Sequence, residues 1–255
     1  MDLVQSVERT LKILEVLSDY SDGLGITVIS EKVNLHKSTV FRLLTTLIHK
    51  GYVVQDTESS KYKITFKLFE LGSKKVDKLD FLKSSKTYTR MLMESVNEVV
   101  HLIIREDTEI VYIDKVEANN TISMASRIGK RNPLYCTATG KAILAFLPEE
   151  EVLEVWNGSK IVKLTGNTIT DFILFKKELQ NIKHNGYAID DEENEIGVRC
   201  IGAPIFNIKG NVAGAVSISG PINRVTGDKI DFISKEVIKY ANLISEEVGY
   251  KWNTV

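Results

Sequence analysis

The stretch that decides the fold is GITVISEKVNLHKSTVFRLLTTLIHKGYVV, which runs from Gly25 to Val54. Its spacing predicts two short helices joined by a tight turn, followed by a glycine and a strand. The second of these helices has an apolar arc made of Val40, Leu43, Leu44, Leu47 and Ile48. Its opposite side carries Ser38, Arg42, Thr45 and His49, with Phe41 and Thr46 at the margins.

The polar side of this second helix indicates a DNA-binding surface. A helix that only faces water more often carries Glu and Lys, which are good helix formers. Small hydroxyl groups, an arginine and an aromatic ring are the side chains that suit a helix in the major groove of DNA. The same three-helix shape is also compatible with a protein-interaction module, and Phe41 and Tyr62 are each also candidates for the core.

The residues on either side complete a winged helix-turn-helix. A first helix is expected over residues 4–18, and Thr27 is a natural N-cap for the short helix that follows it. Gly51 stops the second helix of the pair. Two strands, at residues 52–55 and 61–65, flank a polar turn and form the wing.

The predicted DNA contacts lie on the helix pair and on the wing. Arg42 is the first choice for a contact to a base. The residues expected to touch phosphate, or both phosphate and bases, are Lys37, Ser38, Thr45, Lys61 and Tyr62. The complete predicted set is Thr27, Lys37, Ser38, Thr39, Phe41, Arg42, Thr45, Lys61 and Tyr62.

The distribution of charge supports this assignment, although the net charge of the whole chain is only −1. Residues 1–30 carry two basic side chains against five acidic ones, whereas residues 31–67 carry seven basic against three acidic. The positive segment is therefore the one that would face phosphate. An excess of this size is also common on surfaces that only face water.

The composition is that of an ordinary globular protein: 255 residues, 43% hydrophobic and 26% charged, long enough for one large or two small domains. No apolar run approaches the length of a membrane span, and the acidic, amphipathic N-terminal segment is unlike a signal peptide, so we expect a cytoplasmic protein. Cys136 and Cys200 are expected to be reduced thiols. Because the cysteines and histidines include no closely spaced ligand pair, we expect no structural zinc site.

The rest of the chain has a different pattern. A lysine-rich linker helix is expected over residues 69–86, between a DNA-binding domain (1–68) and a second domain (87–255). The second domain reads as strands, then helices, then strands, which predicts an α+β fold with a mainly antiparallel sheet. The expected strands cover residues 99–105, 110–116, 121–127, 198–206 and 212–219, with another after Gly186. The expected helices cover residues 139–146, 149–156, 170–185 and 228–248.

Three stretches make the chain resemble the IclR family of bacterial transcription regulators: the helix pair quoted above, RIGKRNPLYCTATGKAILA (127–145) and EIGVRCIGAPIFNIKGNVAGAVSISGP (195–221). The resemblance covers nearly the whole length, and the two later motifs together are highly specific. It implies an N-terminal winged helix-turn-helix and a C-terminal GAF-like effector-binding domain. It also implies homodimers, or dimers of dimers, on the palindromic operators of catabolic operons. The family includes both repressors and activators.

The residues of the second domain also predict a pocket for an anionic metabolite. Thr137–Gly140 come just before an expected helix, so their backbone N–H groups are free to bind a carboxylate. Ser217 and Ser219 are two apart on a strand and therefore point to the same face. The resemblance places the effector-binding positions at Ala138, Thr139, Asp190, Cys200, Ser217 and Ser219, with Met124 and Val198 as the apolar wall.

Each of these residues also has a plainer interpretation. Thr139 is a good N-cap, and Asp190 belongs to an acidic run of the kind that is usually only solvated. The two serines are also compatible with a strand face in water. A thiol in the position of Cys200 is more often a small buried group than a ligand contact. For Cys136, the hypothesis of redox sensing is weaker than the interpretation as a packed thiol.

We therefore expect a ligand-responsive DNA-binding transcription regulator, with a repressor favoured over an activator, that senses a small carboxylate or a sugar acid. No catalytic residue, cofactor or metal is expected. The first alternative is a thiol-dependent enzyme, with Cys136 or Cys200 as nucleophile and His101 or His184 as base. The second is a sensory protein that does not bind DNA, and the polar face of residues 37–49 argues against it.

Overall fold

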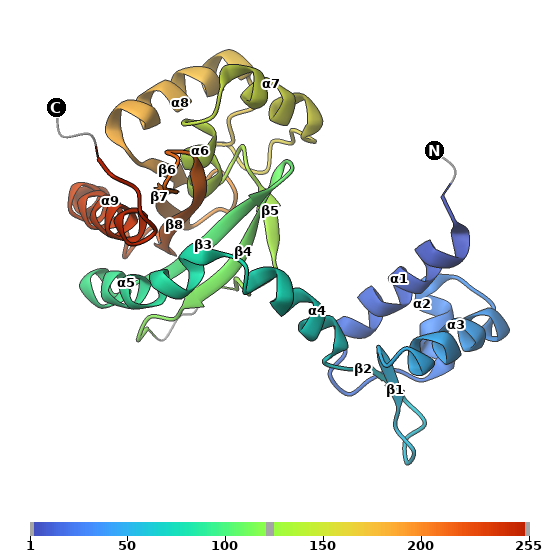
Figure 1. Cartoon of the computed structure of the whole chain (residues 1–255). Helices are drawn as coiled ribbons and strands as arrows, with labels where there is room; N and C mark the ends of the chain where they lie inside the picture. The colour runs from blue at the N-terminus through green and yellow to red at the C-terminus, as the bar shows by residue number, and fades with distance from the viewer. Residues whose placement is uncertain (1–2, 121–124, 253–255) are drawn as a thin grey trace. The chain divides into compact units, whose positions relative to one another are not determined.

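The computed structural model describes residues 3–120 and 125–252 (Figure 1). Its chain divides into two compact units, Met1–Lys78 and Leu79–Val255. Each unit has its own hydrophobic core, because the apolar side chains of each gather in separate clusters.

The linker is two helices rather than one. Helix α4 spans Lys67–Val76, and helix α5 spans Asp80–Val96. Between them Leu79 has an extended backbone, with φ −87° and ψ 96°, which does not fit inside a helix. The linker helix expected over residues 69–86 thus ends at Val76, residues 80–86 belong to α5, and the boundary between the two units falls in this break.

The first unit is a winged helix-turn-helix. Its elements are α1 (Gln5–Ser18), α2 (Ile26–Val33), α3 (Lys37–His49), β1 (Val53–Gln55), β2 (Tyr62–Ile64) and α4. The two strands pair antiparallel. Asn34 follows α2 and Gly51 follows α3, and both are in the left-handed region, with φ of 53° and 76°. Asn and Gly adopt this conformation more readily than other residues, so both helices end where the sequence predicts.

The core of this unit joins the three helices to the wing. Its buried members are Ile13, Leu14, Leu17, Leu24, Ile29, Val33, Val40, Leu44, Leu47, Val53 and Tyr62. The apolar arc predicted for α3 is confirmed at Val40, Leu44 and Leu47. Ile48 is instead 39% exposed, so the arc is narrower than predicted and leaves more of the helix open to solvent.

Thr27 is not the N-cap of α2. The helix begins one residue earlier, at Ile26, and the capping position is Gly25, whose backbone is extended and which has no side chain to cap with. The carbonyl of Gly25 accepts from the N–H of Ile29 at 3.1 Å. Thr27 therefore lies in the first turn, where its side chain is exposed.

The second unit is built on one six-stranded antiparallel sheet with strand order β5-β4-β3-β8-β7-β6. Its strands are β3 (Val99–Glu106), β4 (Glu109–Val116), β5 (Arg131–Pro133), β6 (Ala188–Asp191), β7 (Val198–Phe206) and β8 (Val212–Pro221). The central pair, β3 and β8, comes from opposite ends of the unit's sequence. Their register places His101 opposite Ser217.

Helices cover both faces of this sheet (Figure 1). One face packs against α5 and α9 (Ile230–Glu247), which follows a short 3₁₀ turn (Gly227–Lys229). The other face carries α6 (Ala138–Leu144), α7 (Glu149–Gly158) and α8 (Phe172–Asn185). Side chains alternate between the faces, so Val100 and Leu102 enter the first core, whereas His101 and Ile103 point toward α6.

The strand expected over residues 121–127 falls mostly on residues that the structure does not describe. Residues 121–124, and with them Met124, lie outside the described residues, and residues 125–127 form no strand. On the side away from β3, β4 pairs with β5, which begins four residues after the end of the expected strand. It ends at Pro133, which has no N–H to donate and therefore suits an edge strand.

Candidate DNA-binding surface and effector pocket

The polar side of α3 lies on the surface of the first unit. Phe41 is 56% exposed, which rules out its interpretation as a core residue. Ser38, Arg42 and Thr45 are exposed as well. The hydroxyl of Thr45 donates to the carbonyl oxygen of Phe41 at 2.8 Å, and its lone pairs stay available to accept. The helix therefore offers an aromatic ring, a guanidinium group and hydroxyl groups on one face.

The other predicted DNA contacts have different surroundings. Lys37, Thr27 and Lys61 are exposed, whereas Thr39 is half-buried. The turn of the wing is stabilised by Asp56, whose carboxylate accepts from the N–H of Ser59 at 2.8 Å and from its hydroxyl at 2.7 Å. That turn places Lys61 at the start of the returning strand, open to solvent.

Tyr62 is a core residue, so its prediction as a DNA contact is wrong. Its side chain is only 4% exposed and belongs to the cluster that joins the helices to the wing. Its backbone N–H and carbonyl pair with Leu24, at 2.8 and 3.0 Å. In a strand of three residues the alternation of side chains does not reveal which face is buried, and these two bonds direct Tyr62 inward.

The second unit contains one cavity that brings the predicted effector residues together. Ala138, Thr139, Asp190, Val198, Cys200, Ser217 and Ser219 all line it. The sequence prediction missed other lining residues, among them His101, Tyr112, Lys130, Asn132 and Asn194. His101 was considered only as a base for an enzyme, because its position in the pocket depends on the pairing of β3 with the distant β8.

The register of four strands explains how these residues converge. Cys200 on β7 lies opposite Ser219 on β8, and Asp190 on β6 lies opposite Cys200. Ser217 and Ser219 are both buried, so the expectation that they share a face is confirmed and the interpretation that they face water is wrong. The sheet thus supplies one row of polar groups beneath α6.

His101 connects two sides of this pocket. Its Nδ1 lies 3.3 Å from the hydroxyl of Ser219, and its Nε2 lies 2.6 Å from the hydroxyl of Ser126. Burial, with help from Lys115 and Lys130, lowers the pKa of His101 to about 3. The ring is therefore neutral at physiological pH, so one of its nitrogens donates and the other accepts.

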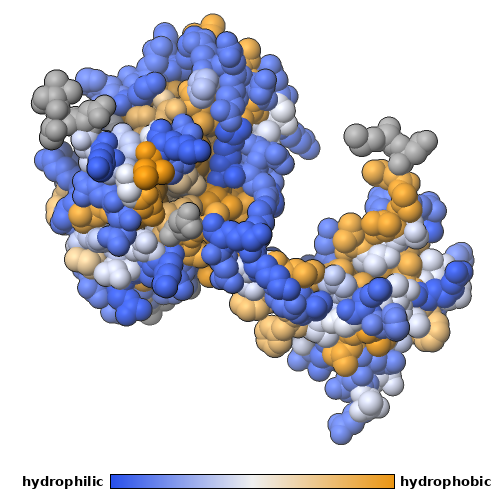
Figure 2. Space-filling view, in the orientation of Figure 1, coloured by the Kyte–Doolittle hydropathy of each residue, from blue (hydrophilic) through white to orange (hydrophobic). Residues whose placement is uncertain are grey.

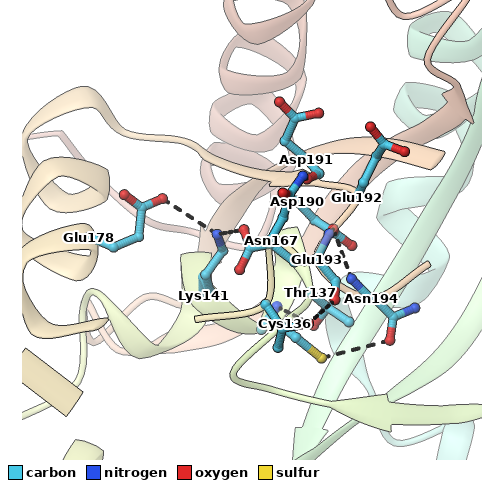
Figure 3. Close-up of polar contacts among 12 residues, drawn as sticks. Cys136, Thr137, Lys141, Asn167, Glu178, Asp190, Asp191, Glu192, Glu193 and Asn194 are labelled. Carbon is cyan, nitrogen blue, oxygen red and sulfur yellow. Dashed lines mark hydrogen bonds and ion pairs between the residues drawn. The ribbon is translucent and has the colours of Figure 1, made fainter. Parts of the chain in front are cut away.

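Asp190 is a buried acid, so its interpretation as part of a solvated run is wrong. It lies on β6, only 3% exposed, while its neighbour Asp191 points outward. The carboxylate accepts from the N–H groups of Glu193, at 2.8 Å, and Asn194, at 3.3 Å (Figure 3). Burial nonetheless raises the pKa of Asp190 to about 6, because these hydrogen bonds compensate only part of the lost hydration.

The turn before α6 is capped by Thr137, not by Thr139. The helix begins at Ala138, and the N–H of Gly140 donates to the hydroxyl of Thr137 at 3.2 Å. A Cβ at Gly140 would lie 2.2 Å from the carbonyl oxygen of Leu134, so only glycine fits there. Both observations explain the spacing of the TATG motif, and they leave the side chain of Thr139 among the lining residues of the pocket.

Neither thiol has the environment of a nucleophile. Burial raises the pKa of Cys136 to about 12, and burial beside Asp190 raises the pKa of Cys200 further. Cys200 shares a neighbour with His101, because the hydroxyl of Ser219 donates to its sulfur at 3.0 Å. Sequence reasoning did not foresee this proximity. A thiol that stays protonated and a histidine that stays neutral do not form an activated pair.

Within the ranges 3–120 and 125–252, no cluster of three His, Cys, Asp or Glu side chains has the geometry to hold a metal ion. Over the same ranges, no helix is both long enough and apolar enough to span a membrane.

Known protein families match both halves of the chain. A model of the IclR helix-turn-helix domain matches residues 6–57, and one described as the bacterial transcriptional regulator IclR C-terminal domain matches residues 73–246. The HTH-type transcriptional regulator KdgR of Escherichia coli (strain K12) is 38% identical over 249 residues, covering 98% of this chain and 94% of that protein. The transcriptional repressor IclR of the same organism is 33% identical, covering 96% and 90%.

The crystal structure of the Thermotoga maritima IclR superposes with a TM-score of 0.84 at 36% identity, covering 97% of this chain and all of that one. The relatives are transcription regulators rather than enzymes. With both family models matched and relatives above 30% identity over almost the whole length, the chain belongs to the IclR family of DNA-binding transcription regulators.

Proposed function

We propose that this regulator is an effector-controlled repressor of a catabolic operon, which acts in the cytoplasm on a palindromic operator. The observation that carries the proposal is the cavity of the second unit. Its floor holds Asp190, Ser217, Ser219 and His101, each at most 5% exposed. Buried polar groups are costly unless they are partnered, so a row of them around a cavity favours a small polar ligand.

The proposed effector is a small carboxylate or a sugar acid. Ser217 and the ammonium group of Lys130 line the cavity and can donate hydrogen bonds to a carboxylate. Asp190 can accept from a hydroxyl group of the same ligand. This combination favours an acid that also carries hydroxyl groups over a simple aliphatic acid.

On the DNA side, we propose that α3 lies in the major groove and that Arg42 contacts a base. Lys37, Ser38 and Thr45 would then meet phosphates beside it, and Lys61 would do so from the wing. The exposed ring of Phe41 is available for a contact to a thymine methyl group. Thr27 and Thr39 stay in the proposed set at its margin.

We further propose that two copies of the chain associate, as dimers or dimers of dimers. Apolar side chains gather along α1 and the segment just before it in Figure 2, and four of them are more than half exposed: Leu3, Val4, Val7 and Leu11. An apolar stripe of this kind on a helix usually packs against a partner. A second copy of this chain is the partner that a palindromic operator requires, because the two half-sites of the operator need two copies of α3.

The proposal is tested with the full chain and matched pairs of compounds. The acids are pyruvate, D-gluconate and D-galacturonate, and their neutral analogues are pyruvamide, D-glucitol and D-galactose. An acid present at 100 times its dissociation constant stabilises the folded state by about 2.7 kcal/mol and raises the melting temperature. The operator is obtained by selection from random DNA, and its affinity is followed by fluorescence anisotropy.

We expect at least one acid to raise the melting temperature and weaken operator binding while its neutral analogue does neither. Melting temperatures that respond to no acid would reject the effector class. An acid that strengthens operator binding would reject the repressor assignment and leave the effector site in place.

A further inference from the structure

A lysine is fully buried behind the effector pocket. Lys141 lies on α6, and the exposed fraction of its side chain is 1%. Its ammonium group contacts the carboxylate of Glu193 and lies 3.4 Å from that of Glu178 on α8 (Figure 3). A buried ion pair is often no more stabilising than apolar side chains of similar volume, so its presence calls for another explanation.

Glu193 is held from several directions although it does not line the pocket. Its N–H donates to the carboxylate of Asp190 at 2.8 Å. Its carbonyl oxygen accepts from the hydroxyl of Thr168 at 2.7 Å, and the hydroxyl of Thr165 lies 3.4 Å away. Its side chain is 8% exposed, and within the described residues its Oε2 has no hydrogen-bond partner. One carboxylate oxygen is thus left unpaired inside the protein so that the other can reach Lys141.

The pair joins two walls of the pocket. On one side, Lys141 follows Ala138 and Thr139 on the same short helix, and both of these residues line the cavity. On the other side, Glu193 belongs to the turn whose N–H groups hold Asp190. A change in the distance between Lys141 and Glu193 therefore changes the distance between α6 and the carboxylate of Asp190.

We propose that the Lys141–Glu193 ion pair is a positioning element of the effector pocket, which holds the turn after Asp190 at a fixed distance from α6. Both members are positioning residues, since they act through Asp190 and α6 without touching the ligand. The inference rests on the proposed function for the identity of the pocket. It predicts a measurable property of the chain in the absence of any effector.

The charges around the pair make its two halves distinguishable. The groups that face Glu193 are Lys141 from α6, Glu178 from α8, Asp190 from β6 and the thiol of Cys136 before α6. Burial raises the pKa of Glu193 to about 7, while Lys141 opposes that rise. Lys141 also lowers the pKa of Asp190. Loss of the lysine must therefore raise the pKa of Asp190, whereas Glu193, which is mostly protonated below pH 7, has little charge to lose in the range where Asp190 titrates.

The test uses the full chain without effector, in the variants Glu193→Gln and Lys141→Met, with Glu178→Gln as the matched control. Glu178→Gln also removes a carboxylate from Lys141, but Glu178 lies on α8, and within the described residues no hydrogen bond joins its side chain to the turn after Asp190. The first readout is alkylation of Cys200 by iodoacetamide, located by peptide mass spectrometry. The second is the titration of the Asp190 carboxyl group by ¹³C NMR of labelled aspartate, assigned with Asp190→Asn.

We expect Cys200 to be alkylated about tenfold faster in Glu193→Gln and in Lys141→Met, because the turn over the pocket opens locally. Glu178→Gln should stay within about twofold of the parent chain by the same reasoning. The pKa of Asp190 should rise in Lys141→Met, which loses the nearby positive charge, and should not rise in Glu193→Gln, which keeps it.

Unchanged alkylation in both pair variants would overturn the proposal. So would an Asp190 pKa that falls in Lys141→Met, since a general loosening of the fold hydrates the carboxyl group and lowers that pKa. If one variant does not fold, the other still gives the direction of the shift and the alkylation rate. Because neither readout uses an effector, these results keep their meaning even if no acid acts on operator binding.

Discussion

The surface of α3 and the pocket of the second unit use the same kinds of side chain under opposite conditions. Hydroxyl groups and a basic residue face water on α3, where Ser38, Arg42 and Thr45 are exposed. Hydroxyl groups and an imidazole are enclosed in the pocket, where Ser217, Ser219 and His101 are at most 5% exposed. The pKa of His101 is strongly shifted there, whereas the α3 face keeps its groups hydrated.

This difference separates the two kinds of ligand. A hydrated polar face costs nothing to maintain and suits a large charged partner such as DNA. An enclosed polar row is costly to bury even when its groups bond one another, so it favours a small ligand that adds hydrogen bonds to them. On the proposed function, the first region provides affinity for DNA and the second provides control.

The largest expected effect concerns Tyr62, which the structure assigns to the core. Tyr62→Ala should destabilise the first unit by about 3–5 kcal/mol, the usual cost of removing a buried aromatic ring. Tyr62→Phe should leave operator affinity unchanged, because the hydroxyl is not at the DNA-facing surface. Circular dichroism during urea unfolding and fluorescence anisotropy measure the two quantities. A Tyr62→Phe variant that folds normally but loses affinity would return Tyr62 to the DNA contacts.

Asp190 gives the pH dependence of the buried region. Its pKa is 3.8 in an ordinary environment and about 6 in the folded chain, so the ionised form is disfavoured by folding. Below pH 3.8 the acid is protonated in both the folded and the unfolded chain, and the free energy of unfolding is at its full value. That free energy falls as the pH rises through about 6, because the unfolded chain ionises more readily than the folded one. An asparagine at position 190 does not ionise, so it causes no such pH-dependent loss of stability. Relative to the parent chain, Asp190→Asn should therefore gain about 3 kcal/mol between pH 3 and pH 7.

Urea unfolding of the full chain at several pH values measures this gain. Both tryptophans, Trp156 and Trp252, belong to the second unit, so their fluorescence follows that unit. Asp191→Asn is the matched control, because Asp191 is exposed and adjacent. A stability difference for Asp190→Asn that does not change with pH would show that the acid is not buried as described.

Arg42 tests the hydrated region. Arg42→Ala should weaken operator binding by about 1–3 kcal/mol, or about 5- to 150-fold, and relax the sequence preference at one position. Its stability should change little. Arg90→Ala, an exposed arginine on α5, is the control. Equal affinity and unchanged preference in Arg42→Ala would mean that α3 does not present this face to the bases.

The smallest effect compares one hydroxyl from each region. Thr137→Ala removes the cap of α6 and should cost about 1 kcal/mol of stability, whereas Thr137→Ser should restore most of it. Thr45→Ala removes an exposed hydroxyl and should change stability by less than about 0.5 kcal/mol while it weakens operator binding. Thermal unfolding and anisotropy on the same samples decide the comparison. A loss of stability in Thr45→Ala together with unchanged stability in Thr137→Ala would contradict the comparison.

Sequence reasoning succeeded where a repeating pattern carries the information. The apolar arc of α3 predicted the exposed ring of Phe41, and the spacing of Ser217 and Ser219 predicted a shared face. Helical and strand periods determine such positions without knowledge of the tertiary structure.

It failed where the outcome depends on distant partners. Tyr62 is buried because its backbone pairs with Leu24, and His101 reaches the pocket because β3 pairs with β8. In the sequence, Asp190 is indistinguishable from its solvated neighbours, and its burial follows from the pairing of β6 with β7. The strand β5 likewise depends on a tertiary contact, its pairing with β4.

The most direct test of the central proposal is the effect of the acids on operator binding in the chain with and without its pocket serines. The acids are pyruvate, D-gluconate and D-galacturonate, and the variant is Ser217→Ala combined with Ser219→Ala. The proposal predicts that one acid weakens operator binding by the parent chain, and that this response is lost in the double variant while its affinity without acid is unchanged. An acid response that persists undiminished in the double variant would contradict it.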